Sequence, residues 1–138
     1  MRPSLFYRIA AIVSLLFMIG HTAGFLTFRP KSAEGQAAIR AMAVIFNEDG
    51  TRFSYEGFYK GLGLSCTLAM LLIAVWSWWL GGLAKSMPRA TIVPGIALTV
   101  YQLGGLVLAG LYFPAPAIAF SALLPILYAV AVAGAARA

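Results

Sequence analysis

The feature that most constrains this chain is the long run without a charged side chain from Ala90 to Ala136. As a single helix the run would be roughly 70 Å long at about 1.5 Å per residue, more than twice the hydrocarbon thickness of a bilayer. It must therefore fold back on itself. Phe113-Pro114-Ala115-Pro116 supplies the turn, because proline lacks an amide donor and disfavours helix in the residue before it. The pattern predicts two membrane helices, at about residues 90–113 and 117–136.

Two shorter uncharged runs, Ile9–Phe28 and Gly61–Ala84, each reach the length of about 20 residues that a helix needs to cross a bilayer. They predict helices at about residues 5–28 and 54–84, and the first run continues beyond the point where a signal peptide would be cleaved. We therefore expect an all-α, polytopic membrane protein. Its four transmembrane helices would form an antiparallel bundle as one domain over residues 1–138.

The composition agrees with a chain that lies mostly in lipid. Hydrophobic residues make up 62% of it and charged residues 10%, and the mean hydropathy is +0.89. Such a balance excludes an ordinary soluble enzyme. The single cysteine excludes a disulfide scaffold, and the net charge of +6 does not indicate a nucleic-acid partner, because the charges lie in short segments between apolar runs.

The segment between the first two helices predicts a short amphipathic helix at about residues 33–46. Its apolar residues recur at helical spacing from Ile39 to Phe46, whereas Glu34 and Arg40 lie off that stripe. The turn-forming Asn47-Glu48-Asp49-Gly50 would end the helix. We expect it to lie on the membrane surface or across the end of the bundle. Packing on neighbouring loops is its simplest role, and a lid over a cavity is the alternative.

Charge sets the predicted orientation. An even number of crossings places both termini on one side, and each side carries five basic residues. All four acidic residues fall on the side of the first loop, so that side has a net charge of +1 and the side of the termini has +5. Because the Lys and Arg count of the positive-inside rule is tied, we take the difference in net charge to favour cytoplasmic termini.

His21 is the first candidate for a functional group, because ionisable side chains inside membrane helices face the protein interior and need partners. Glu56 and Lys60 are four residues apart at the start of the second helix, and Tyr59 lies beside them. One hypothesis is an acid–base pair of His21 and Glu56, with Lys60 and Tyr59 among the ligand-binding groups. The simpler interpretation is that His21 locks two helices together and that Glu56 and Lys60 form a solvated i, i+4 pair.

Gln102 and Tyr128 are the remaining candidates for ligand binding. Gln102 precedes Phe113 by about three helical turns, and Tyr128 follows Ala117 by the same distance. The hairpin therefore brings them to the same depth, where they could hydrogen-bond. Packing is the simpler role for this pair. The spacing of His, Cys and acidic residues indicates neither a metal site nor a cofactor.

The first two predicted helices and the loop between them contain a series of distinctive motifs. They are Gly20-His21-Thr22-Ala23-Gly24-Phe25-Leu26-Thr27-Phe28-Arg29-Pro30, Glu34-Gly35, Arg40-Ala41-Met42, Tyr55, Gly57-Phe58-Tyr59, Gly61-Leu62-Gly63-Leu64 and Trp78-Trp79-Leu80-Gly81. These motifs resemble those of a family of uncharacterised small bacterial membrane proteins with four predicted helices. The resemblance implies a four-helix protein of the bacterial inner membrane and supplies no activity.

Three classes of function fit these observations. The first, which we favour, is a non-enzymatic membrane protein that binds a lipid-like ligand or a partner membrane protein, including another copy of itself. The second is a membrane-embedded enzyme that uses His21 and Glu56. The third is a small transporter or channel subunit, although four short helices could form a pore only weakly or as an oligomer. The absence of acidic residues deep in the helices argues against the proton-coupled drug-efflux type of transporter.

Overall fold

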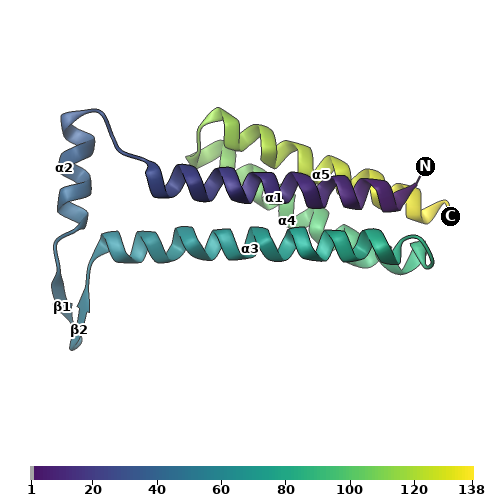
Figure 1. Ribbon diagram of the computed structural model, residues 1–138, viewed down its shortest axis with the longest axis horizontal. Coiled ribbons are helices and arrows are strands. Elements are labelled where there is room, and N and C mark those ends of the chain that lie inside the picture. The colour runs from purple at the N-terminus through teal and green to yellow at the C-terminus, as the bar shows by residue number, and fades with distance from the viewer. Residues whose placement is uncertain (1) are drawn as a thin grey trace. The chain divides into compact units, whose positions relative to one another are not determined.

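The computed structural model describes residues 2–138 and confirms four helices that are long and apolar enough to cross a membrane (Figure 1). They are α1 (Pro3–Thr27), α3 (Tyr55–Leu83), α4 (Ile92–Tyr112) and α5 (Ala115–Ala136). A shorter helix, α2 (Ala33–Met42), and two strands, β1 (Phe46–Glu48) and β2 (Thr51–Phe53), lie between α1 and α3, and the 3₁₀-helix η1 (Pro88–Thr91) precedes α4.

Internal contacts divide the chain into two compact units. Unit 1 contains the described residues up to Phe17 together with residues 70–138, and unit 2 contains residues 18–69. Because α1 and α3 each contribute to both units, the division falls within helices. The single domain over residues 1–138 therefore stays a prediction.

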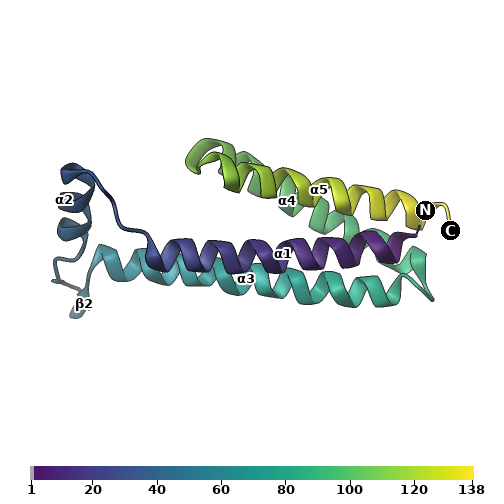
Figure 2. The same ribbon diagram turned by 45° about the horizontal axis from the view of Figure 1, so that its top comes forward.

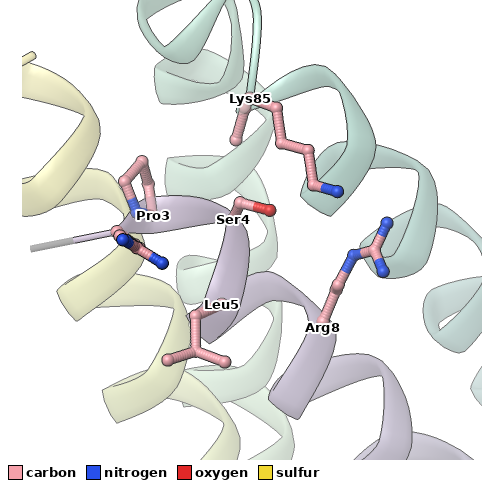
Figure 3. A pocket seen from close by; sticks show the side chains of 7 residues that line it. Pro3, Ser4, Leu5, Arg8 and Lys85 are labelled. Atoms are coloured by element: carbon pink, nitrogen blue, oxygen red, sulfur yellow. The ribbon is translucent and has the colours of Figure 1, made fainter.

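In unit 1, α4 and α5 pack along each other as a hairpin (Figure 2). The hairpin turns at Phe113 and Pro114, which both have extended backbone. Helix α5 begins two residues earlier than predicted, at Ala115, because a proline is tolerated in the first turn, where its missing amide costs no hydrogen bond. Both termini lie at one end of this unit, where the first turns of α1 lie beside the turn that carries Lys85 (Figure 3).

The core of unit 1 joins α1, α3 and α5. Tyr7 and Tyr128 are its largest fully buried side chains, and their ring centroids lie 6.3 Å apart. The Tyr7 hydroxyl donates to the carbonyl of Thr91 at 2.8 Å, and the Tyr128 hydroxyl pairs with Ser77 Oγ at 2.6 Å. A hydroxyl buried away from water needs such a partner, so these two bonds allow tyrosine in the apolar interior.

Unit 2 contains a short hairpin that the sequence analysis did not predict. Helix α2 ends at Met42, and the chain then pairs Phe46 with Phe53 across an antiparallel ladder, with ring centroids 5.3 Å apart. Asp49 and Gly50 both have positive φ, 50° and 78°, as the tight two-residue turn of a hairpin requires. The predicted helix end at residue 46 was therefore four residues too late, because this turn draws Phe46 into a strand.

Close packing in unit 1 depends on Gly95 of α4. A Cβ at Gly95 would lie 2.6 Å from Val132 and would overlap the Tyr7 hydroxyl. We expect Gly95→Ala to lower the free energy of unfolding by about 1–3 kcal/mol, because overpacking forces buried neighbours to move. Denaturation by SDS in mixed micelles, followed by circular dichroism, measures this change. Gly104→Ala in the same helix is the matched control, since a Cβ there has nothing within 4 Å; equal destabilisation of the two variants would contradict the packing role of Gly95.

Candidate functional site

His21, the first predicted candidate, lies on α1 in unit 2 and faces α3. Its Nε2 is 3.2 Å from the carbonyl oxygen of Gly63. Since a carbonyl can only accept, Nε2 carries the proton and donates. The imidazole ring also stacks on Phe25, with the centroids 5.9 Å apart. This environment joins two helix segments, as the simpler interpretation of His21 predicts.

Neighbouring side chains reinforce the contact between the two helix segments of unit 2. Thr22 Oγ1 and Thr67 Oγ1 lie 2.9 Å apart. The Phe25 ring occupies the space in which a side chain at Gly63 would have to lie, and its centroid is 5.2 Å from that of Tyr59. Tyr59, a predicted ligand-binding residue, thus takes part in aromatic packing in this structure.

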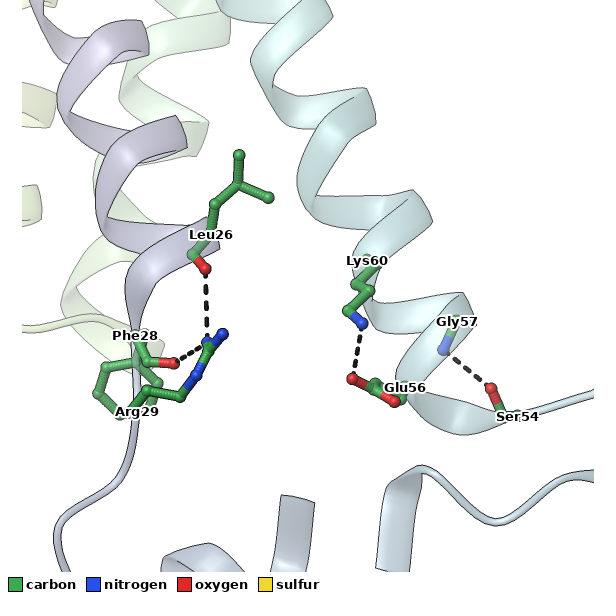
Figure 4. Close-up of polar contacts among 7 residues, drawn as sticks. All are labelled: Leu26, Phe28, Arg29, Ser54, Glu56, Gly57 and Lys60. Carbon is green, nitrogen blue, oxygen red and sulfur yellow. Dashed lines mark hydrogen bonds and ion pairs between the residues drawn. The ribbon is translucent and has the colours of Figure 1, made fainter. Parts of the chain in front are cut away.

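Glu56 and Lys60 form the expected i, i+4 ion pair, with 2.6 Å between Lys60 Nζ and Glu56 Oε1 (Figure 4). The side chains are 33% and 58% exposed, respectively, so water screens the pair and it contributes little to stability. Glu56 precedes Gly63 by seven residues, about 10 Å along a helix. His21 bonds at the level of Gly63, and no hydrogen bond between His21 and Glu56 exists in the described chain.

Gln102 and Tyr128 both lie in unit 1, where they are 7% and 0% exposed. The expected hydrogen bond between them is absent from the described residues, because the Tyr128 hydroxyl is bonded to Ser77 instead. Ser77 lies on α3, which the sequence pattern could not place beside α5. The structure thus assigns Tyr128 to the α3–α5 contact rather than to a pair with Gln102.

The site that the sequence analysis missed is an open pocket at the end of unit 1 that holds both termini (Figure 3). Its volume is about 480 Å³. Three cationic side chains line it, and the rest of the lining is one hydroxyl and apolar surface, with no acidic residue among the lining side chains. We call it the basic pocket; its residues are Arg2, Pro3, Ser4, Leu5, Arg8, Ala84 and Lys85.

Arg8 is the most firmly held cation of the basic pocket. Its guanidinium carbon lies 4.5 Å from the centre of the Trp78 ring, a cation–π contact. Its side chain passes so close to Gly81 that a Cβ there would be 2.8 Å from Arg8 Cγ. Within the described chain, Arg8 Nε is buried and has no hydrogen-bond partner. The pocket therefore holds a fixed, incompletely bonded cation.

The Ser4 hydroxyl contributes differently to the basic pocket. Ser4 Oγ donates to the carbonyl of Gly81 at 2.5 Å, so its hydrogen is already used. This bond ties the start of α1 to α3 and leaves the cations as the side chains that can donate to a ligand. The arrangement can bind an anionic group, and its lining residues include no carboxylate and no imidazole.

The charge pattern contained a signal for this pocket. Arg2, Arg8 and Lys85 fall on the side of the termini, where the sequence has no acidic residue. The sequence does not indicate that these residues are close in space, because two predicted membrane helices and the first loop separate Arg8 from Lys85. Only the packing of α1 on α3 brings them together.

The chain has no significant match among protein-family models, curated proteins or solved structures. Nor do the described residues contain a group of three His, Cys, Asp or Glu side chains that could hold a metal ion. The function therefore has to be inferred from the residues described above.

The geometry of His21 leads to a test of its structural role. We expect His21→Ala to lower the free energy of unfolding by about 1 kcal/mol, because the Gly63 carbonyl loses its interhelical donor. His21→Gln should lose less, since an amide can also donate. The same SDS denaturation measures both variants. Thr27→Ala is the control, as the Thr27 hydroxyl bonds only within its own helix. A His21→Ala variant as stable as this control would contradict the role of His21 in joining the two helix segments.

Proposed function

We propose that this chain is a non-enzymatic integral membrane protein that binds a lipid-like ligand in the basic pocket. The pocket itself carries the proposal. Arg2, Arg8 and Lys85 surround an open volume that also exposes the apolar Leu5, and α1 begins a membrane-spanning segment at this point. A cationic rim beside an apolar surface at a helix end suits an amphiphile with a polar head and a hydrocarbon body.

The partners of the polar candidates support binding over catalysis. His21 donates to a backbone carbonyl, Glu56 is paired with Lys60, and Tyr128 is paired with Ser77. An acid–base mechanism needs two groups within reach of one substrate atom. His21 and Glu56 lack that proximity here, so the enzymatic alternative has less support than a ligand site.

We further propose a topology for the chain in the membrane. The four long helices would form an antiparallel bundle in the inner membrane of a bacterium, and both termini and the basic pocket would lie in the cytoplasm. The side of the termini carries five basic residues and no acidic residue, and this charge supports the orientation. We propose that α2 is amphipathic and lies on the opposite membrane surface, since none of its residues is buried.

Cysteine accessibility tests the proposed orientation. Cys66 is the sole cysteine, so Cys66→Ala gives a background for single-cysteine variants. Ser86→Cys lies in the turn after α3 and Glu48→Cys in the hairpin of unit 2, and both positions are exposed. In right-side-out vesicles a membrane-impermeant maleimide should label Glu48→Cys and spare Ser86→Cys. Inside-out vesicles should give the opposite pattern, and the reverse result in either preparation would overturn the topology.

Photo-cross-linking tests ligand binding in the pocket. Leu5 lines the pocket and is 54% exposed, whereas Val93, also in unit 1, is 77% exposed and lies outside it. With benzoylphenylalanine at Leu5, we expect lipid adducts enriched at least about threefold in one headgroup class. Adducts at Val93 should reflect the bulk membrane. Mass spectrometry of the full chain identifies the adducts.

The cross-links also separate the alternatives. Equal lipid composition at the two positions would overturn the proposed ligand site. Protein adducts at Leu5 in place of lipid would identify the pocket as a contact with a partner membrane protein or with a second copy of the chain, and would likewise overturn it.

A further inference from the structure

We infer that the ligand of the basic pocket is the phosphate of an anionic phospholipid and that Arg8 is the residue that selects it. This inference rests on the proposed function, because it names the chemical class of the ligand that the pocket would bind. It adds two statements, the identity of the recognised group and the role of one side chain.

Charge balance provides the first step. Unit 1 contains Arg2, Arg8, Lys85, Arg89 and Arg137 and not one Asp or Glu side chain. Three of these cations line one pocket, and no residue of the pocket can neutralise them. No acidic side chain of unit 1 supplies the compensating charge, so these cations are available to an anion from outside the polypeptide. At the end of a membrane helix the most abundant anions are lipid phosphates, and basic pockets between helices bind such headgroups.

The donors of the pocket provide the second step. Because the Ser4 hydroxyl hydrogen is bonded to Gly81, the available side-chain donors are the guanidinium and ammonium groups. Figure 3 shows the Arg8 and Lys85 side chains directed toward the same space beside Ser4. A phosphate presents several acceptor oxygens in different directions, so a planar guanidinium and a separate ammonium can bind it together.

The rigidity of Arg8 provides the third step. Trp78 holds the guanidinium at 4.5 Å, and Gly81 leaves the space that the side chain crosses. Arg8 Nε is buried and has no hydrogen-bond partner in the described chain, which leaves the terminal nitrogens of the guanidinium to donate to a ligand. Arg8 is thus fixed before the ligand arrives, whereas Arg2 and Lys85 are exposed and contribute chiefly through charge.

Fluorescence of Trp78 tests the inference directly. The chain has three tryptophans, so the double substitution W76F/W79F leaves Trp78, beside Arg8, as the sole reporter. The full chain in a nonionic detergent is titrated with dioleoylphosphatidylglycerol or with dioleoylphosphatidylcholine. We expect the anionic lipid to shift the Trp78 emission with at least about fivefold tighter binding than the zwitterionic lipid. Equal binding of the two lipids would overturn the anionic class.

Substitutions in the same background test the role of Arg8. Arg8→Lys keeps the charge and loses the planar fork, so binding of the anionic lipid should weaken at least about fivefold. Lys85 is exposed and does not belong to the core, so Lys85→Gln should leave the fold intact. It should weaken binding of the anionic lipid to a similar extent. Arg89→Lys is the matched control, because Arg89 lies outside the pocket lining. It should change binding less than about twofold.

The remaining outcomes are also informative. Binding of sodium phosphate as tight as that of the anionic lipid would identify a free anion as the ligand and overturn the lipid source. Unchanged binding by Arg8→Lys would overturn the selective role of Arg8, while headgroup enrichment at Leu5 would still uphold the proposed function. Loss of that enrichment would reject both proposals.

Discussion

Inside a bilayer a polar group has no water to bond, and this constraint accounts for most of the polar contacts in the structure. Tyr7, Tyr128 and Ser77 have the low exposure of a core, and every hydroxyl among them is bonded. His21 follows the same rule through the Gly63 carbonyl. Residues that look chemically competent in the sequence are thereby engaged in joining helices, which leaves them few free atoms for a substrate.

Arg8 Nε and the Ser14 hydroxyl are the two buried side-chain atoms of the described residues that lack a hydrogen-bond partner, and only Arg8 carries a charge. The one hydroxyl that lines the pocket with it, that of Ser4, donates to Gly81. No carboxylate of unit 1 is available to Arg8, because the acidic residues all lie between Glu34 and Glu56. Within unit 1, Arg8 has no acidic side chain to pair with, and a group from outside the chain could provide the missing bonds. The same sequence bias that supports the orientation of the protein in a membrane thus also favours an external anion beside Arg8.

The sequence was sufficient to predict the four membrane helices, because crossing a bilayer depends on the length and polarity of a segment. The Glu56–Lys60 pair was also predictable, since i, i+4 neighbours meet on any helix. Only the turn of the hairpin in unit 2 was predictable from the sequence. Asp49-Gly50 is a strong hairpin turn, yet strands of three residues give too short an alternation to be distinguished from the end of a helix.

Contacts between distant segments were not predictable in the same way. The depth argument that brought Gln102 beside Tyr128 used distance from the turn and contained no information about helix rotation. Tyr128 faces Ser77 because α5 presents that side to α3. Likewise, no pattern within α1 indicates that Arg8 lies over Trp78, since this depends on which face of α3 packs against α1.

The position of Arg8 differs from that of an arginine that is simply solvated at a membrane surface. An arginine near a helix end usually extends toward the membrane surface with a free side chain, which keeps its conformational entropy and its hydration. Arg8 instead lies against two residues of one α3 face, Trp78 and Gly81, which are three positions apart. Immobilising such a side chain costs up to about 2 kcal/mol of conformational entropy, and the cation–π contact returns about 0.5–2 kcal/mol. The cation–π contact can therefore offset the immobilisation of Arg8, and it holds the guanidinium in place for the anion that we propose.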